Sequence, residues 1–221
     1  MRPARVAAVS AVSEHFRLVD LEGDALKNIA WTVGEKIQIS MGTGLMARTY
    51  TPISWDTERG RTRLLAFMHG DAPGSRWAGG LREGDTCQFF GPRRSLDLSG
   101  IEAPLVLFGD ETSFALAAAL RTLQSPRTTV IFEVSDVAES GPVLEEIGLG
   151  DANLTARAAN DAHLGAVADK VAAHASTGAH FVLTGKAPAI QHVNRALRAA
   201  GVGSSRMKTK AYWAPGKTGL D

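Results

Sequence analysis

The sequence predicts a two-domain protein in which a six-stranded antiparallel β-barrel is followed by an α/β domain with a parallel sheet. In roughly the first hundred of the 221 residues, short apolar segments alternate with turns. In the remainder, apolar strands alternate with helical segments, which implies a parallel sheet with helices on its faces. The pattern changes near residues 99–104, so we expect domains at residues 1–100 and 101–221.

The barrel is predicted from six strands separated by turns in which Gly stands beside Asp, Glu or Thr. Six short strands with one small helix, which we expect at residues 75–81, are sufficient for a closed antiparallel barrel. The strands are expected at residues 5–10, 16–21, 36–40, 47–51, 63–68 and 86–90.

The second domain begins with a compact apolar strand that ends at Gly109 and leads into an alanine-rich helix. Because parallel sheets bind nucleotides at the carboxyl ends of their strands, this first strand–turn–helix is a candidate nucleotide site. We expect strands at residues 105–108, 129–134 and 181–183, and helices at residues 113–123, 163–174 and 189–200.

The composition excludes several classes of protein. With 44% hydrophobic residues the chain can bury a core, and its net charge of +1 argues against a nucleic-acid partner. Its one cysteine, Cys87, excludes an internal disulfide and a cysteine-bound metal cluster, and the six scattered histidines predict no metal site. No apolar run approaches the roughly 18 residues of a membrane span, and residues 1–12 do not read as a signal peptide. We therefore expect a cytoplasmic protein without a membrane partner.

Residues 48–52, Arg-Thr-Tyr-Thr-Pro, form the segment most suggestive of a ligand. Side chains two apart on a strand share a face, so Arg48 and Tyr50 should project together. Pro52 keeps the preceding residue out of the α region. A guanidinium beside a flat aromatic ring suits a ligand that carries phosphate and a ring system, such as a flavin dinucleotide. The outer face of an ordinary strand explains the same residues.

A second phosphate-compatible element follows at residues 67–78. Its turn, rich in Gly, Asp and Pro, leads into the short helix with Gly74 or Ser75 near the N-cap. A helix N-terminus presents unpaired N–H groups and a partial positive charge, which favour an anion. A capped turn without a ligand, with His69 satisfied locally, is the alternative.

In their order along the chain, these motifs resemble those of the siderophore-interacting proteins, which are ferredoxin reductase-like FAD enzymes that reduce ferric siderophores. The resemblance extends from about residue 6 to residue 216. Two positions depart from the family pattern, since Ala72 and Arg94 both stand where the family more often has Gly. The motifs are Arg48-x-Tyr50-Thr51-Pro52, His69-Gly70-Asp71, Pro73-Gly74-Ser75-Arg76-Trp77-Ala78, Gly91-Pro92-Arg93 with Ser95, Gly109-Asp110-Glu111-Thr112-Ser113 and Ala211-Tyr212-Trp213-x-x-Gly216.

The resemblance implies an FAD site in the barrel domain. In it, Tyr50 packs on the isoalloxazine, Thr51 hydrogen-bonds near its reactive edge, and Arg48 is a bidentate donor to the pyrophosphate. The implied FAD-binding residues are Arg48, Tyr50, Thr51, His69, Asp71, Gly74, Ser75 and Trp77.

The turn at residues 109–113 lacks the Gly-x-Gly-x-x-Gly fingerprint of dinucleotide sites. Asp110 and Glu111 favour a helix start through its dipole but would oppose a nearby pyrophosphate, so a capped helix without a ligand fits equally well. The resemblance implies instead that the turn faces NADPH or NADH through the hydroxyls of Thr112 and Ser113 and through backbone amides. The implied NAD(P)H-binding residues are Asp110, Glu111, Thr112, Ser113, Lys186 and Trp213.

The end of the second strand, Phe-Glu-Val-Ser-Asp at residues 132–136, bears on the choice between the two nucleotides. An acid there can bind a ribose hydroxyl, whereas a 2′-phosphate requires Arg or Lys nearby. The residues therefore favour NADH, but the resemblance leaves NADPH open because family members use either.

The last part of the chain is basic, since residues 186–217 contain seven Lys and Arg and no acid. Arg206, Lys208 and Lys210 alternate, so a strand would place all three on one face. Such a row could hold an anionic iron chelate near the flavin or the phosphates of the nucleotide. The resemblance favours the ferric siderophore, with Lys186 as a further contact. A solvated basic edge strand is the alternative.

The activity implied by the resemblance is an FAD-dependent ferric-siderophore reductase that passes electrons from NAD(P)H through FAD to Fe(III) and releases Fe(II). No protein residue is expected to act as a catalytic acid or nucleophile, because the chemistry belongs to the flavin. We expect a monomer, and a ferredoxin is an alternative donor. An NAD(P)H-flavin reductase, an oxygenase's reductase component without an iron–sulfur cluster, and a non-catalytic FAD-binding protein remain open.

Overall fold

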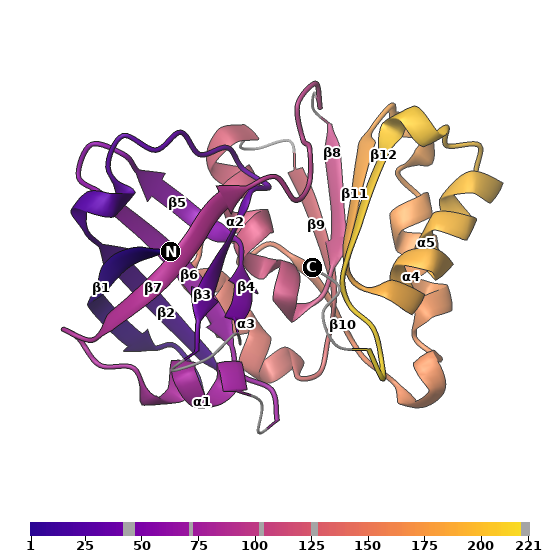
Figure 1. Cartoon of the computed structure of the whole chain (residues 1–221). Coiled ribbons are helices and arrows are strands. Elements are labelled where there is room, and N and C mark those ends of the chain that lie inside the picture. Colours follow the sequence, from indigo (N-terminus) through magenta and orange to yellow (C-terminus); the bar gives the residue numbers. More distant parts are fainter. Residues whose placement is uncertain (42–46, 71–72, 102–103, 125–127, 218–221) are drawn as a thin grey trace. The chain divides into compact units, whose positions relative to one another are not determined.

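The computed structural model divides into two compact units, Met1–Ser95 and Leu96–Asp221, each with its own sheet and core (Figure 1). Among the residues that it describes, no helix has the length and apolarity needed to cross a bilayer. The described residues are 1–41, 47–70, 73–101, 104–124 and 128–217.

The first unit is an antiparallel sheet of seven strands in the order β4-β3-β7-β1-β2-β6-β5, and one short helix, α1 (Pro73–Gly80). Sheet hydrogen bonds join each strand to its neighbours in this order, so β4 and β5 form its two ends. The strands are β1 (Arg2–Ala11), β2 (Phe16–Glu22), β3 (Lys36–Ser40), β4 (Ala47–Tyr50), β5 (Pro52–Asp56), β6 (Arg61–Phe67) and β7 (Thr86–Arg93).

The two ends of this sheet are joined by a single residue, Thr51, between Tyr50 of β4 and Pro52 of β5. The sheet must therefore curl until its edges approach one another, as the predicted barrel requires. Among the described residues of this unit, no sheet hydrogen bonds join β4 to β5, so the barrel is curled without a continuous ring of hydrogen bonds. The fold class is confirmed.

The number of strands predicted for this unit was wrong, because β5 was missed. Pro52 lacks an N–H and was read as the end of a strand, although proline is tolerated where a strand lies at a sheet edge. β5 is such an edge strand, paired on one side with β6. The core of this unit consists of fully buried hydrophobic side chains. They include Val6, Val19, Leu21, Leu26, Ile37, Ile39, Leu64 and Phe89.

The second unit is a parallel sheet in the order β10-β9-β8-β11-β12. Its first strand lies in the middle, and the chain builds outward on one side before returning to the other. The strand order therefore reverses between β8 and β11, which is where open α/β sheets bind ligands. The strands are β8 (Leu105–Gly109), β9 (Thr128–Val134), β10 (Asn153–Ala156), β11 (His180–Lys186) and β12 (Met207–Trp213).

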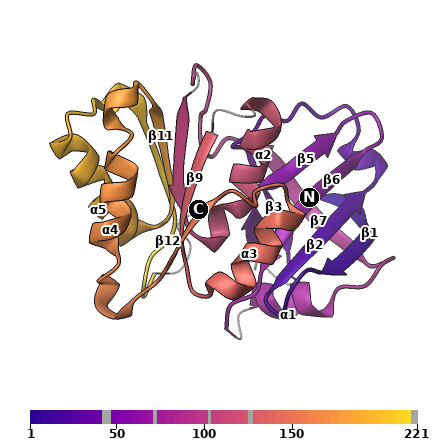
Figure 2. The ribbon, with the colours of Figure 1, turned by 180° about the vertical axis from the view of Figure 1, so that it is seen from behind.

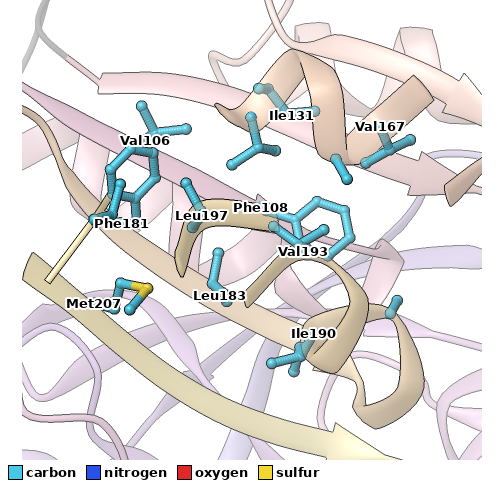
Figure 3. Packing of buried hydrophobic residues seen from close by; sticks show 14 of the residues in the cluster. Val106, Phe108, Ile131, Val167, Phe181, Leu183, Ile190, Val193, Leu197 and Met207 are labelled. Carbon is cyan, nitrogen blue, oxygen red and sulfur yellow. The ribbon is translucent and has the colours of Figure 1, made fainter. Parts of the chain in front are cut away.

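Helices cover both faces of this sheet (Figure 2), with α4 and α5 on one face and α2 and α3 on the other. Figure 3 shows the core beneath α4 and α5, where Phe108, Leu183 and Val193 pack together. Strand β10 and helix α3 were not predicted, since β10 is short and Pro142 lies inside α3. The helices are α2 (Phe114–Gln124), α3 (Val137–Glu146), α4 (Leu164–Ala172) and α5 (Ala187–Ala199).

Candidate functional site

Arg48 and Tyr50 share one face of β4. Arg48 lies opposite Ile39 and Tyr50 opposite Ile37 on β3, and directly opposed residues of an antiparallel pair project to the same side. Both isoleucines belong to the barrel core. The Tyr50 ring is half-buried against that core, and burial raises the pKa of its hydroxyl. Arg48 lies farther out and is exposed.

Helix α1 closes against this face of β4. The ring centroids of Trp77 and Tyr50 are 5.7 Å apart and the rings are tilted by 43°. A Cβ added to Gly74 would lie 3.1 Å from Cγ of Arg48, so the first turn of α1 approaches the arginine as closely as glycine allows. Strand and helix therefore bring together a cation, two aromatic rings and a helix N-terminus.

The loop that enters α1 is tied back to β6. The Ser75 hydroxyl donates to the His69 carbonyl at 3.1 Å, and the His69 ring lies 5.5 Å from the ring of Phe67. Thr51, between β4 and β5, is half-buried. Asp71, which the resemblance placed in the FAD site, lies outside the described residues, as does Ala72.

The geometry of this first cluster fits FAD. The Arg48 guanidinium donates to the carbonyl of Ala47 at 3.0 Å. Among the described residues, no carboxylate pairs with this guanidinium. Its charge stands beside the first N–H groups of α1, which have no partner within the helix. Together these donors suit a pyrophosphate, and the Tyr50–Trp77 pair offers apolar surface to a ring system.

A second cluster of predicted residues lies in the second unit, at the carboxyl ends of β8, β11 and β12. One oxygen of Asp110 accepts from the backbone N–H of Thr112 at 2.9 Å and from its hydroxyl. The other accepts from the backbone N–H of Lys186 and the indole N–H of Trp213, each at 2.8 Å. Asp110 therefore joins three strand ends that are far apart in the sequence.

Burial dominates the ionisation of Asp110. The side chain is 1% exposed, and burial raises its pKa to about 6 although the hydrogen bonds favour the charged form. Gly185 is essential to this arrangement, because an added Cβ would lie 2.5 Å from Oδ2 of Asp110 and its φ is +99°. Only glycine meets both requirements without a shift of the strand end.

The hydroxyls expected to contact the nucleotide serve the turn itself. Ser113 is fully buried, and its Oγ accepts from the Thr184 hydroxyl at 2.8 Å. The Thr112 hydroxyl donates to Asp110. Lys186 contacts the same edge, since its Nζ donates to Asp161 at 2.6 Å and lies 6.0 Å from the centroid of the Trp213 ring.

Glu111 points in the other direction and links β8 to β9 and β10. Its Oε1 accepts from the backbone N–H and the hydroxyl of Ser135, both at 2.6 Å. The Arg157 guanidinium pairs with both of its oxygens, at 2.7 and 2.6 Å. Ser135 and Arg157 were missed as functional candidates, although Arg157 is the single basic residue among the acids of residues 133–169.

The predicted basic row is split by the structure, so the expectation of one strand face carrying Arg206, Lys208 and Lys210 is wrong for Arg206. It lies in a 3₁₀ turn before β12, where its guanidinium donates to the carbonyls of Ala175 and Ala179 at 3.3 Å. These carbonyls lie at the amino-terminal side of the sheet, away from Trp213. Lys208 and Lys210 do alternate on β12, half-buried on the face opposite the core residue Met207.

Comparison with known proteins gives matches for both units. Residues 35–96 match the model of the siderophore-interacting FAD-binding domain, and residues 103–216 match that of the siderophore-interacting protein family. No curated protein sequence matches the chain.

Solved structures share the fold over nearly the whole chain. A siderophore utilization protein from T. fusca is 24% identical with a TM-score of 0.75, and the match covers 100% of this chain and 95% of that one. The siderophore-interacting protein SipS from Aeromonas hydrophila is 18% identical with a TM-score of 0.79, covering 98% and 92%. The flavohem-like FAD/NAD binding domain of nitric oxide dioxygenase from Vibrio cholerae is 17% identical with a TM-score of 0.71, covering 97% and 99%. The ferredoxin reductase in carbazole 1,9a-dioxygenase shares the fold as well, at 17% identity with a TM-score of 0.74, covering 95% of this chain and 68% of that one, so the fold is ferredoxin reductase-like.

Proposed function

Because this chain belongs to the siderophore-interacting protein family, we propose that it is an FAD-dependent reductase that passes electrons from NAD(P)H to siderophore-bound Fe(III). The product is Fe(II), which hard oxygen ligands hold more weakly. The observation that carries the proposal is the cluster of Arg48, Tyr50, Gly74 and Trp77, which lies within the matched FAD-binding domain.

The residues in and around this cluster would have separate tasks toward FAD. Arg48, with the first N–H groups of α1, would hold the pyrophosphate. Tyr50 would pack on the isoalloxazine, and Thr51 would donate to its edge. The bond between Ser75 and the His69 carbonyl keeps the entry to α1 in place. When bound, FAD would supply the conversion of a two-electron donor into single-electron transfers to iron, so no protein acid, base or nucleophile is required.

The nucleotide is proposed to bind at the switch point between β8 and β11. Asp110 would act there as a positioning residue, because it fixes the backbone of Lys186 and the indole of Trp213. The carboxylate is buried beneath these groups, which moderates its repulsion of a phosphate. The ferric siderophore, an anionic chelate, is proposed to meet Lys208 and Lys210 with Lys186. Arg206 is no longer proposed for this role, since its guanidinium is engaged by backbone carbonyls.

The test is a visible spectrum of the purified protein under nitrogen, before and after NADH or NADPH and again after a ferric catecholate. We expect a flavin spectrum that bleaches and then returns while a ferrous chelator records Fe(II). A protein purified without flavin, and unable to bind added FAD, would contradict the proposal.

The other outcomes separate the alternatives. NAD(P)H could bleach the flavin while the ferric chelate fails to re-oxidise it. If only free flavin or a partner oxygenase then restores the spectrum, the protein is a flavin reductase or an oxygenase's reductase component. Bleaching by reduced ferredoxin alone would assign the donor to a protein. A bound flavin that neither donor reduces would indicate a binding protein.

A further inference from the structure

A buried ion pair at the carboxyl end of β9 bears on which nicotinamide the protein uses, an inference that rests on the proposed function. In parallel nucleotide-binding sheets, the end of the second strand meets the adenosine ribose, through an acid for a 2′-hydroxyl or a cation for a 2′-phosphate. In this unit the second strand is β9, and Ser135 and Asp136 follow it directly. Arg157 stands at the adjacent strand end, where its backbone N–H donates to the Val134 carbonyl at 2.7 Å.

The two side chains here that could bind a 2′-phosphate are already engaged. The Arg157 guanidinium holds both oxygens of Glu111, with side-chain exposures of 20% for the arginine and 2% for the glutamate. It also donates to the Glu133 carbonyl at 3.2 Å. The Ser135 hydroxyl donates to the same glutamate at 2.6 Å. Both donors therefore point inward, toward a buried carboxylate.

The charge that remains at the surface is negative. Asp136 is exposed, and one of its oxygens caps α3 by accepting from the backbone N–H of Glu139 at 3.0 Å. Another cation on a neighbouring element, Lys170 of α4, donates to Thr155 at 3.1 Å. A 2′-phosphate would meet the Asp136 charge, and to recruit Arg157 it would have to leave Glu111 buried and unpaired, which is strongly unfavourable. A 2′-hydroxyl is uncharged and can donate to Asp136.

We infer that Glu111 selects NADH over NADPH, by holding Arg157 and Ser135 away from the ribose while Asp136 faces it. In this role Glu111 determines specificity without touching the nucleotide. The preference expected for the wild-type protein is at least about tenfold in kcat/KM for NADH, the ratio that corresponds to about 1.4 kcal/mol.

The first experiment measures binding apart from turnover. Binding of 5′-AMP and of 2′,5′-ADP to the FAD-loaded protein is measured by calorimetry or saturation-transfer NMR. We expect 5′-AMP to bind more tightly by about tenfold. Tighter binding of 2′,5′-ADP, or binding of neither fragment, would overturn the inference.

The second experiment uses two variants and a control. Glu111→Gln weakens the hold on Arg157, and Asp136→Asn removes the exposed charge while keeping a good N-cap residue. Each should raise the NADPH-to-NADH ratio and the relative affinity for 2′,5′-ADP several-fold, and Asp136→Asn does so even if Glu111→Gln fails to fold. Asp169→Asn, an exposed acid on α4, changes the net charge equally and should leave both ratios unchanged.

The two levels of proposal fail in different ways. If 5′-AMP binds better than 2′,5′-ADP but neither nicotinamide reduces the flavin, the reductase proposal fails and the inference about the ribose site stands. If NADPH reduces the flavin better than NADH, the reductase proposal stands and the inference is wrong.

Discussion

At the scale of single residues, Arg48 carries a charge that no carboxylate among the described residues neutralises. Its guanidinium reaches the carbonyl of Ala47, and its stem lies against Gly74. Arg63 of the same unit, by contrast, makes two bonds to Asp20, at 2.7 and 2.8 Å. An exposed cation held beside a helix N-terminus is poised for an external anion.

Replacing Arg48 by Ala should weaken FAD binding by about ten- to a hundredfold, the usual cost of a lost hydrogen bond to a charged group. Thermal stability of the apoprotein should change little, because the side chain is exposed. Flavin affinity is measured by fluorescence titration of the apoprotein. Arg59→Ala, whose side chain is 80% exposed, is the control and should bind FAD normally. Equal affinities of the two variants would refute the assignment of Arg48.

Asp110 gives a prediction about pH. Its folded-state pKa is raised from 3.8 to about 6, so as the pH falls the folded protein binds this proton at a higher pH than the unfolded chain does. The stabilisation is complete below pH 3.8 and is lost as the pH rises through about 6. The negative charge of Glu111 also raises the pKa of Asp110.

The measurement follows the indole N–H of Trp213 by NMR between pH 4 and pH 8. Because protonation weakens the acceptor of that N–H, its resonance should titrate with a midpoint near 6. In Asp110→Asn this titration should vanish. The unfolding free energy of the wild type, relative to that of the variant, should fall by roughly 3 kcal/mol as the pH rises from the unfolded-state pKa of Asp110 to above its folded-state pKa. A Trp213 resonance that is flat across this range in the wild type would show that Asp110 stays charged.

At the scale of elements, α1 has a sequence suited to close approach and poorly suited to helix stability. Its eight residues, Pro73–Gly80, include three glycines, which are weak helix formers. Gly74 is the one whose missing side chain is used, because Arg48 occupies that space. Glycine at position 74 therefore lowers the stability of α1 but allows Arg48 of β4 to approach it closely.

Gly74→Ala should therefore separate stability from binding. Alanine favours the helix by about 0.5–1 kcal/mol, but its methyl group would lie 3.1 Å from Cγ of Arg48 and displace the guanidinium. We expect an unchanged or higher melting temperature with FAD affinity reduced several-fold. Gly79→Ala lies in the same helix with its nearest contact, Met68 Sδ, at 3.5 Å, and should keep the affinity. Loss of affinity in both variants would point to helix rigidity instead.

Local pattern was enough to predict most elements but not their partners. Turn residues and apolar periodicity located six of the seven barrel strands, and only β5 was lost, because Pro52 opens it. Arg206 was assigned to a strand by alternation alone, whereas its guanidinium is engaged by carbonyls 27 and 31 residues away. Its place was decided by a contact that local spacing does not encode.

The two candidate sites differ in how far they could be predicted from local sequence. Arg48, Tyr50, Gly74 and Trp77 lie within thirty residues or so of one another, and their motif order was informative. The bonds of Glu111 to Arg157 and of Asp110 to Trp213 span 46 and 103 positions. They exist because parallel strands bring distant carboxyl ends to one edge, which becomes visible only once the strand order is known.

At the scale of the whole molecule, the two proposed ligand sites lie on two units that each have their own core. The proposed FAD cluster lies on β4 and α1, whereas the proposed nucleotide edge lies at β8, β9, β11 and β12. A ligand that binds only the folded state stabilises the elements it contacts, by RT ln(1 + [L]/Kd). Each ligand should therefore protect a different part of the chain.

Hydrogen–deuterium exchange of the apoprotein, with FAD or with 5′-AMP added separately, tests this division. At a ligand concentration of 100 Kd, exchange through opening of the bound elements should slow by up to about a hundredfold. FAD should protect β4 and α1 and leave the cores of β8 and β11 unchanged. 5′-AMP should protect the residues that follow β8 and β9, including Ser135 and Asp136. Protection of the nucleotide edge by FAD alone would instead mean that the two units open as one, and that flavin loading prepares the protein for its electron donor.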